Sequence, residues 1–563
     1  MAVELVVDGR SVTVERDGVS LLEALRGEIG SFGAKDGCSP QGQCGCCTVL
    51  VDGQPRVACV TAVRRVAGRS IVTVDGLPRS VVGPLAGALL ASGGSQCGFC
   101  TPGIICRLAA LGPDPSPAAL DRALLSHLCR CTGWQGIREA ALRWRPDEPG
   151  PQHRGVDRVE QRSPGPVGTG VAGSARGSAA DRRAGIEGRS PQAVGLGAVL
   201  GRGGFAADTV PAGALYAVPG EGGDWVVGET LSDARSAAGA RSGRRSGQAL
   251  TWPVELPAGD WAVALRTTWV EPGYLEPDTS WCVPGGQPVS PLANGGAFGA
   301  KLGSPVTAAA RRLADEHARP VLAVMSREDV VRLGPKRPPL AIGVRADGTG
   351  VARVVRTPGI AASIRSMAPG LSVEEVDVAG PPTSSTVRAA GWAEAAMVSA
   401  ALRAGADRRR GDGTPTAGTA RSGGSARVGS ARVGSPDGSE ASASVELGPA
   451  GAPTRVGVVV DCGELLDEVV LRSYVVGAAH MALGWVGSEG VAVDREGHPL
   501  DLTIRSWGIL RAVDMPPVEV DLVDSAGPAV NGSDAVFAAV AAATWIAHGC
   551  PPDLPVARGA LRR

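Results

Sequence analysis

The chain has 563 residues, with 56 acidic and 56 basic side chains. That length is enough for three or four domains. The balanced charge argues against nucleic acid or an anionic membrane surface as a partner, and no apolar run approaches the roughly eighteen residues of a membrane-spanning helix. With 81 glycines, 43 prolines and 3% aromatic residues, the composition is that of a loop-rich protein.

The N-terminal segment predicts a small β-grasp domain. Strands at 3–7 and 11–14 flank Asp8 and Gly9, which are a strong hairpin signal. Ser20 and Glu23 form a capping box that starts a short helix. The first ten residues lack the basic and apolar regions of a signal peptide, so we expect a reducing, cytoplasmic location.

Two sets of four cysteines follow. They read Cys38-x5-Cys44-x2-Cys47-x11-Cys59 and Cys97-x2-Cys100-x28-Cys129-x-Cys131, with Cys46 and Cys106 as extras. Thiolates held close together cost free energy unless a cation or cluster neutralises them. Disulfides fit a reducing compartment poorly. Zinc is the second alternative, but the first set is close to the spacing of plant-type ferredoxins, so we predict iron–sulfur clusters.

The second set is expected on helices. Thr101 is a candidate N-cap with Pro102 after it, so Cys97 and Cys100 lie just ahead of a helix N-terminus, where the dipole favours an anionic cluster. Ser116 starts another helix in the same way. We expect a small four-helix arrangement here. Cys46 could replace Cys47 as a ligand, but the x2 and x11 spacings favour Cys47. Cys46 is therefore expected to be unliganded, and Cys106 to be a small buried apolar residue.

Three stretches carry a resemblance to a known family. GCSPQGQCGCCTVLVDG (37–53), QCGFCTPGI (96–104) and LCRCTGWQGI (128–137) resemble the two-[2Fe-2S] subunit of the xanthine dehydrogenase/aldehyde oxidase family of molybdenum hydroxylases. The resemblance implies that the first set binds the cluster remote from molybdenum, that the second binds the one next to the pterin, and that Gln96 approaches the pterin. One departure is the five-residue gap after Cys38, where four is commoner.

Composition marks the boundaries of the remaining regions. Residues 147–192 and 411–444 are Pro/Gly/Arg/Ser-rich tracts, the second with the near-repeat SARVGSARVGS, and neither is expected to bury enough apolar surface to repay ordering. Helices are predicted at 306–317 and 535–547 and a strand at 456–460. We divide the chain into a ferredoxin-like [2Fe-2S] domain (1–76), a helical [2Fe-2S]-binding domain (77–146), a flexible linker (147–194), the first part of a molybdopterin-binding-like region (195–402), a low-complexity linker (403–452) and the C-terminal part of that region (453–563).

Two later motifs extend the resemblance. NGGAFGAK (294–301), which follows YLEP (274–277), resembles the loop that wraps molybdopterin in the large subunit. TVRAAGWAEA (386–395) resembles the loop whose arginine faces the substrate, which would be Arg388. The resemblance therefore implies these cofactor-binding residues in the glycine-rich loop: Gly295, Gly296, Phe298 and Gly299.

Three positions depart from the family pattern. Leu302 stands where purine-oxidising relatives place a substrate-binding glutamate, and Met481 stands where relatives carry a pterin-contacting glutamine. The motif that supplies the catalytic base is present only as NGSD (531–534). Asp534 would then replace a glutamate with a side chain shorter by a methylene, although a general base must lie within hydrogen-bond reach of its proton.

The expected fold class is α+β multidomain: a β-grasp ferredoxin-like domain, a helical [2Fe-2S]-binding domain, then incomplete α+β molybdopterin-binding domains. The expected function is oxidation of an aldehyde, N-heterocycle or purine at a molybdopterin site, with electrons leaving through two [2Fe-2S] clusters. The alternative is an electron-transfer or assembly protein whose molybdenum portion is degenerate. The expected partners are a small-molecule substrate and a separate FAD-binding subunit or other electron acceptor, with oligomerisation left open.

Overall fold

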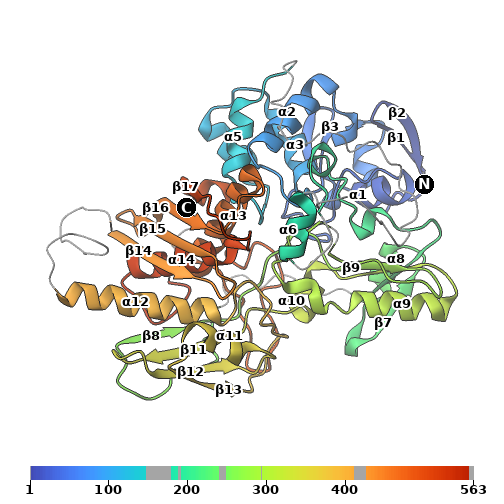
Figure 1. The fold of residues 1–563 in the computed structure, drawn as a ribbon. Coiled ribbons are helices and arrows are strands. Elements are labelled where there is room, and N and C mark those ends of the chain that lie inside the picture. The colour runs from blue at the N-terminus through green and yellow to red at the C-terminus, as the bar shows by residue number, and fades with distance from the viewer. Residues whose placement is uncertain are drawn as a thin grey trace.

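The computed structural model describes residues 2–146, 179–187, 192–239, 249–292, 294–410 and 427–556. They form four separate β-sheets with helices packed on them, so the α+β multidomain prediction is confirmed (Figure 1).

The N-terminal sheet has the strand order β2-β1-β5-β3-β4. Its strands are β1 (Val3–Val7), β2 (Arg10–Val14), β3 (Thr48–Val51), β4 (Gln54–Val57) and β5 (Ser70–Val72). The hairpin of β1 and β2 forms as predicted. Ser20 caps α1 (Leu21–Glu23) by accepting a hydrogen bond from the backbone N–H of Glu23, at 3.2 Å. Cys59 lies in a 3-10 turn directly after β4.

Four helices form the second domain, as predicted. They are α2 (Arg79–Ala91), α3 (Thr101–Leu111), α4 (Pro117–Leu124) and α5 (Gln135–Arg143). The N-cap of α3 is Cys100, one residue earlier than predicted, whereas Ser116 caps α4 as expected. Both cysteines of the Cys97–Cys100 pair therefore precede the first turn of α3.

Two sheets form the middle of the chain. The first has the order β7-β6-β10-β9, and it contains β6 (Leu215–Pro219), β7 (Trp225–Gly228), β9 (Thr279–Cys282) and β10 (Val321–Val324). The second has the order β13-β12-β11-β8, and it contains β8 (Val263–Arg266), β11 (Leu340–Val344), β12 (Gly350–Val355) and β13 (Leu371–Val376). The helices of this part are α6 (Ala179–Glu187), α7 (Leu196–Val199), α8 (Leu231–Ala237), α9 (Val306–His317), α10 (Arg327–Leu333) and α11 (Ile360–Met367). The predicted helix at 306–317 is confirmed.

The C-terminal sheet corrects the prediction of a low-complexity linker at 403–452. Its strands, in order, are β14 (Arg427–Gly434), β15 (Glu440–Leu447), β16 (Pro453–Asp461) and β17 (Val518–Val523). Two of them lie in the predicted linker, and α12 (Trp392–Arg410) also runs into it. In β15 the small apolar residues alternate with polar ones and every second side chain is buried, so strand periodicity prevails over a disorder-like composition. Residues 411–426 of the predicted linker lie outside the described residues.

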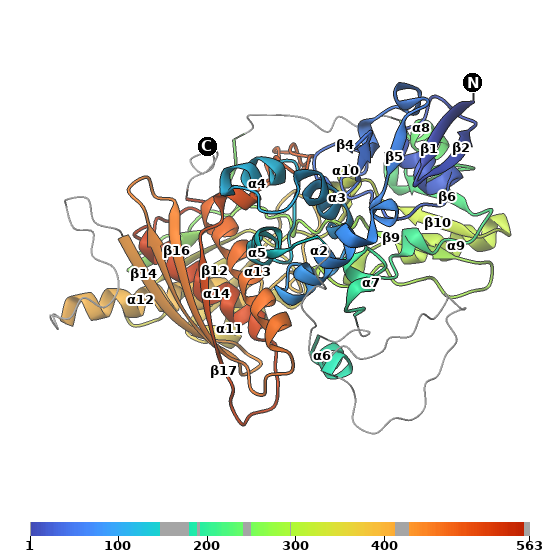
Figure 2. The ribbon, with the colours of Figure 1, turned by 90° about the horizontal axis from the view of Figure 1, so that it is seen from above.

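Helices cover one face of this sheet (Figure 2). They are α13 (Glu468–Gly487) and α14 (Gly532–Ala547), and α14 also contacts α12. The strand predicted at 456–460 and the helix at 535–547 are both confirmed.

α13 is long and apolar enough to cross a membrane by length and composition, but most of its apolar stretch is buried in the fold, as in a core helix. One apolar core joins side chains from 265–401 with side chains from 433–554. The two parts of the molybdopterin-binding-like region therefore pack as one unit.

Of the linker predicted at 147–194, the structure describes only two pieces, α6 and the residues from 192 onward. α6 is held to the C-terminal region by Arg182, whose guanidinium donates to both carboxylate oxygens of Glu464. The rest of that linker lies outside the described residues.

Candidate functional site

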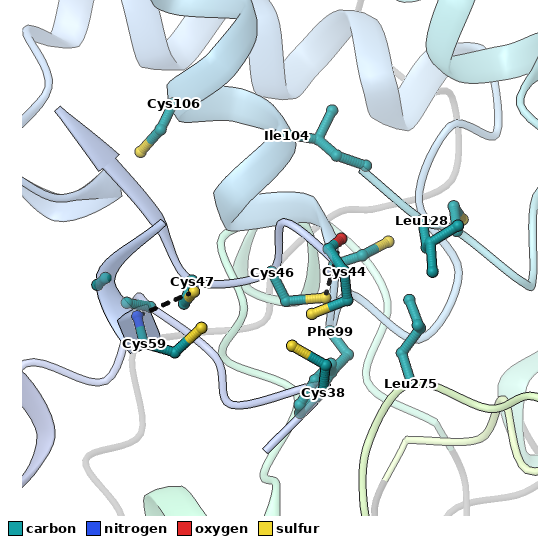
Figure 3. Close-up of a cluster of buried hydrophobic side chains, with 14 of the residues drawn as sticks. Cys38, Cys44, Cys46, Cys47, Cys59, Phe99, Ile104, Cys106, Leu128 and Leu275 are labelled. Atoms are coloured by element: carbon teal, nitrogen blue, oxygen red, sulfur yellow. Dashed lines mark hydrogen bonds between the residues drawn. The ribbon is translucent and has the colours of Figure 1, made fainter. Parts of the chain in front are cut away.

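The first cysteine quartet is assembled from one loop and the turn after β4 (Figure 3). All four thiols are buried. Thiol–thiol contacts pair Cys38 with Cys44 and Cys47 with Cys59, and Cys38 also contacts Cys59. Backbone N–H groups reach the sulfurs as well: that of Gln43 lies 3.4 Å from Cys38 Sγ, and that of Cys59 lies 3.4 Å from Cys47 Sγ.

Cys46 lies beside this quartet. Its thiol contacts Cys44, whose carbonyl oxygen is 4.0 Å away. Cys47, in contrast, contacts Cys59, the last cysteine of the quartet. The ligand assignment stays a prediction, and the geometry favours Cys47. Cys106 lies within α3, where burial raises the pKa of its thiol to about 12.

The second quartet lies where the loop before α3 meets the loop before α5. Cys97 Sγ is 3.7 Å from Cys131 Sγ, and Cys100 contacts Cys129. A small cavity of about 10 Å³ is lined by Cys97, Cys100 and Cys131.

Both quartets fit a binuclear cluster better than a single ion. Among the described residues, no three His, Cys, Asp or Glu side chains converge as they would around one metal. The thiols are instead arranged in pairs, as two irons with two thiolates each require, whereas zinc gathers four ligands around one point. The pKa of Cys38 is lowered by its contact with Cys44, and that of Cys129 by its contact with Cys100. The same contacts raise the pKa values of the partners Cys44 and Cys100, so binding of a cluster would release protons from these thiols.

The loops of the two quartets are in direct contact. The backbone N–H of Leu128 donates to the carbonyl oxygen of Cys44 at 2.9 Å. Gly45 has φ +75°, and a Cβ there would lie 2.5 Å from Nδ1 of His127. His127 is buried, and burial lowers its pKa to about 3. Gly45 therefore permits the close approach of the two loops. The hydrogen bond from Leu128, which precedes Cys129 of the second quartet, to Cys44 of the first quartet joins them.

A cavity of about 230 Å³ adjoins the second quartet. The structure brings nearly all of the predicted molybdenum-site residues to it. Its lining includes the residues Gln96, Cys97, Cys131, Gly296, Phe298, Gly299, Arg388 and Asp534. Gly295 lines the smaller cavity within the second quartet. Because Cys97, Cys131 and Gly296 line both cavities, the candidate cofactor pocket is adjacent to the cluster site.

The glycine-rich loop packs against both the quartet and the arginine loop. A Cβ on Gly296 (φ +76°) would lie 3.1 Å from Cys131 Sγ, and one on Gly299 (φ +83°) would lie 1.7 Å from the carbonyl oxygen of Thr386. Glycine is therefore required at both positions. The N–H of Arg388 also donates to the carbonyl oxygen of Phe298 at 3.1 Å. Two motifs nearly ninety residues apart thus form one wall of the cavity.

Lys301 connects the glycine-rich loop NGGAFGAK (294–301) with the YLEP motif (274–277). Its ammonium lies 2.9 Å from Glu276 of YLEP and 3.1 Å from the carbonyl oxygen of Pro291. Lys301 is 1% and Glu276 9% exposed. A buried ion pair therefore fixes the end of the glycine-rich loop.

Arg388 and Asp534 contact each other in this cavity. Arg388 Nε lies 3.3 Å from Asp534 Oδ1, and Arg388 also donates to Met481 Sδ at 3.0 Å. Its guanidinium is 5.4 Å from the centre of the Phe298 ring. Burial raises the pKa of Asp534, and the positive charge of Arg388 opposes that rise. The predicted base and substrate arginine are therefore adjacent.

Gln96 ties the cavity to the C-terminal region. Its amide nitrogen donates to the carbonyl oxygen of Cys131 at 2.8 Å and to Ser473 Oγ, in α13, at 2.9 Å. Gln96 therefore also holds the second quartet against α13.

The sequence-based prediction missed two groups around the second quartet. The side chain of Asn294, fully buried, donates to the carbonyl oxygen of Cys97 at 2.8 Å. Arg130, between two of the cysteines, is paired with Glu489, 359 residues later in the chain. A charged residue between two predicted ligands was a visible signal, but nothing local indicates its partner.

A larger cavity of about 1110 Å³ lies at the first quartet. Its lining includes Cys59, Ser39, Pro40, Tyr216 of β6 and Arg235 of α8. The two quartets are therefore in contact, and each also lines a separate cavity.

Comparison with known proteins finds relatives of the N-terminal part of the chain. The model of a [2Fe-2S] binding domain matches residues 73–142. The chain is 41% identical over 128 residues to a probable xanthine dehydrogenase subunit of Bacillus subtilis, covering 22% of this chain and 73% of that protein. It is 39% identical over 152 residues to the small subunit of nicotine 6-hydroxylase from Paenarthrobacter nicotinovorans, covering 26% and 89%.

Longer relatives and solved structures extend the comparison. The chain is 38% identical over 146 residues to the aldehyde oxidoreductase of Megalodesulfovibrio gigas, a match that covers 24% of this chain and only 16% of that protein. A solved structure of the aldehyde oxidoreductase from Desulfovibrio gigas matches with a TM-score of 0.65, over 100% of this chain and 99% of that chain, at 15% identity. At that identity the match shows a common fold.

Proposed function

Because the chain belongs to the xanthine dehydrogenase/aldehyde oxidase family of molybdenum hydroxylases, we propose that it oxidises an apolar aldehyde or N-heterocycle and passes the electrons through two [2Fe-2S] clusters. The observation that carries the proposal is the 230 Å³ cavity, in which the second quartet meets Arg388 and Asp534. A substrate pocket and an electron outlet are thereby combined in one place.

The substrate class follows from Leu302. This side chain lines the cavity and is 66% exposed, at the position where purine-oxidising relatives carry a carboxylate. An apolar group there leaves a polar substrate edge without a hydrogen-bonding partner, and unpaired polar groups in a pocket cost binding free energy. An apolar aldehyde or N-heterocycle is therefore favoured over a purine.

The residues of the cavity fit the molybdopterin cofactor of this family. Gly296 and Gly299 let the backbone approach a bound group closely, and Gln96 and Phe298 complete that wall. When bound, the molybdenum cofactor supplies oxygen transfer and takes up two electrons from the substrate. In that reaction Asp534 would accept a proton on its carboxylate, since burial raises its pKa toward the range where a general base works. Arg388 would orient the substrate beside it.

The electrons would leave in the order set by the contacts of the two quartets. The second quartet lines the substrate cavity, the hydrogen bond from Leu128 to Cys44 joins it to the first, and Cys59 lines the 1110 Å³ cavity. A separate FAD-binding subunit or another electron acceptor would meet the chain at the Cys59 side. The relatives named as subunits of multi-subunit enzymes support a partner of this kind.

The test is the metal and pterin content of protein purified from a molybdenum-replete host, together with two variants. Asp534→Ala should lower turnover by about 10²–10⁴-fold with pterin and both clusters still bound. Asp534→Glu, which restores the side-chain length of the family, should keep activity. Unchanged turnover in Asp534→Ala would remove this residue from the mechanism. Wild-type protein with full iron and no pterin would decide for the electron-transfer alternative.

A further inference from the structure

Arg130 occupies an unusual position, between two cysteines of the second quartet. Its guanidinium forms a bidentate pair with Glu489, with both nitrogen–oxygen distances at 2.6 Å. Its Nε donates to the carbonyl oxygen of Pro272 at 3.0 Å. Arg130 is 3% and Glu489 2% exposed. Arg130 also lines the small cavity of about 10 Å³ among the cysteines of the second quartet.

Glu489 comes from a distant part of the chain, and its position just after α13 is fixed. Its backbone N–H donates to the carbonyl oxygen of Gly484 at 2.8 Å, just after α13 ends. A Cβ on Gly484 would lie 2.0 Å from Glu489 Oε1. The last turn of α13 is therefore built to admit this carboxylate, and the C-terminal region delivers it to the helical domain.

The pair has an electrostatic consequence for a bound cluster. A buried charge is costly unless it is paired, and charges act strongly on each other where water is excluded. The reduction potential of an iron–sulfur cluster depends on the net charge around it and on its exposure to solvent. An unpaired Arg130 cation would favour the reduced, more negative state of the cluster, and Glu489 cancels that effect.

We propose that Glu489 is a positioning residue that sets the reduction potential of the second cluster by neutralising Arg130. Through this pair, the C-terminal region controls how readily electrons enter the second cluster from the adjoining cavity. The proposal requires an iron–sulfur cluster in the second quartet, and it does not depend on turnover at the molybdenum site.

The experiment is a redox titration of the full-length protein, followed by electron paramagnetic resonance, which resolves the two clusters. Glu489→Gln keeps the shape and removes the charge, so the midpoint potential of the second cluster should rise while that of the first stays in place. Glu489→Asp, which keeps the charge, should shift it less. The double variant Arg130→Gln/Glu489→Gln should return the potential toward the wild-type value, because both charges are gone.

A control separates this effect from general damage. Asp553→Asn breaks another bidentate pair, the one between Asp553 and Arg266. Neither of these residues lines a quartet cavity, so this variant should leave both potentials unchanged. An iron-replete Glu489→Gln protein with an unshifted second cluster would overturn the proposal, as would a double variant that keeps the full shift of the single one. If Glu489→Gln loses the second cluster, its recovery in the double variant supports the proposal and its loss there refutes it.

Discussion

Replacing Lys301 by methionine tests how strongly the ion pair at the end of the glycine-rich loop holds the fold. The change keeps most of the side-chain volume but leaves the carboxylate of Glu276 buried without its cation, which is 2.9 Å away in the native protein. Breaking a buried pair from one side costs about 3–5 kcal/mol. That range includes the loss of the hydrogen bond from Lys301 to the carbonyl oxygen of Pro291, because a typical hydrogen bond contributes about 1 kcal/mol.

The cost should depend on pH in a definite direction. Burial raises the pKa of Glu276 from 4.5, and the positive charge of Lys301 opposes that rise. Removal of Lys301 therefore raises the folded-state pKa of Glu276 further. A carboxyl group with a raised folded-state pKa stabilises the fold when it is protonated, below its unfolded pKa, and loses that contribution as the pH rises through the folded value. Lys301→Met should therefore be most destabilised near neutral pH and recover on acidification toward pH 4.5.

The assay is equilibrium urea unfolding followed by tryptophan fluorescence at pH 7 and pH 5. Arg432→Ala is the matched control, because it breaks the exposed pair between Arg432 and Glu440, whose side chains are 70% and 45% exposed, and exposed ion pairs contribute little to stability. The double variant Lys301→Met/Glu276→Leu should cost less than the single change, since no charge is left unpaired. A Lys301→Met protein that is no less stable than the control, or whose loss is the same at both pH values, would refute this reasoning.

Three further outcomes are expected. Purified protein should contain about four iron and four acid-labile sulfide per chain, and zinc in their place would contradict the cluster assignment. Cys44→Ser should abolish the signal of the first cluster while Cys106→Ser leaves both clusters intact; loss of a cluster in Cys46→Ser but not in Cys47→Ser would reverse the ligand assignment. The acid limb of kcat/KM should lie above the ordinary aspartate value, because burial raises the pKa of Asp534 and the base works only when deprotonated, and a limb that does not move in Asp534→Glu would assign it to another group.

Local patterns in the sequence predicted much of residues 1–146. The hairpin around Asp8 and Gly9 and the caps at Ser20 and Ser116 depend on residues a few positions apart, and these interactions form wherever the chain can turn. The cysteine spacings were informative for the same reason, because a cluster needs its thiols within a few ångströms and short loops deliver them. The composition of 427–447 did not indicate strands, although Ala441 and Ala443 alternate with serines in β15 at the strand period.

Only the tertiary structure decided how the distant parts of the site meet. Arg388 reaches Asp534 across about 146 residues, and Arg130 reaches Glu489 across 359. Neither pair leaves a trace in the local sequence, because a contact of that separation depends on the packing of α13 and α14 on their sheet and not on any periodicity of the residues involved. The sequence by itself determined the ligands that lie on shared loops. The fold determined the charges that surround them, because an ion pair buried from water is made by whichever elements the core brings together.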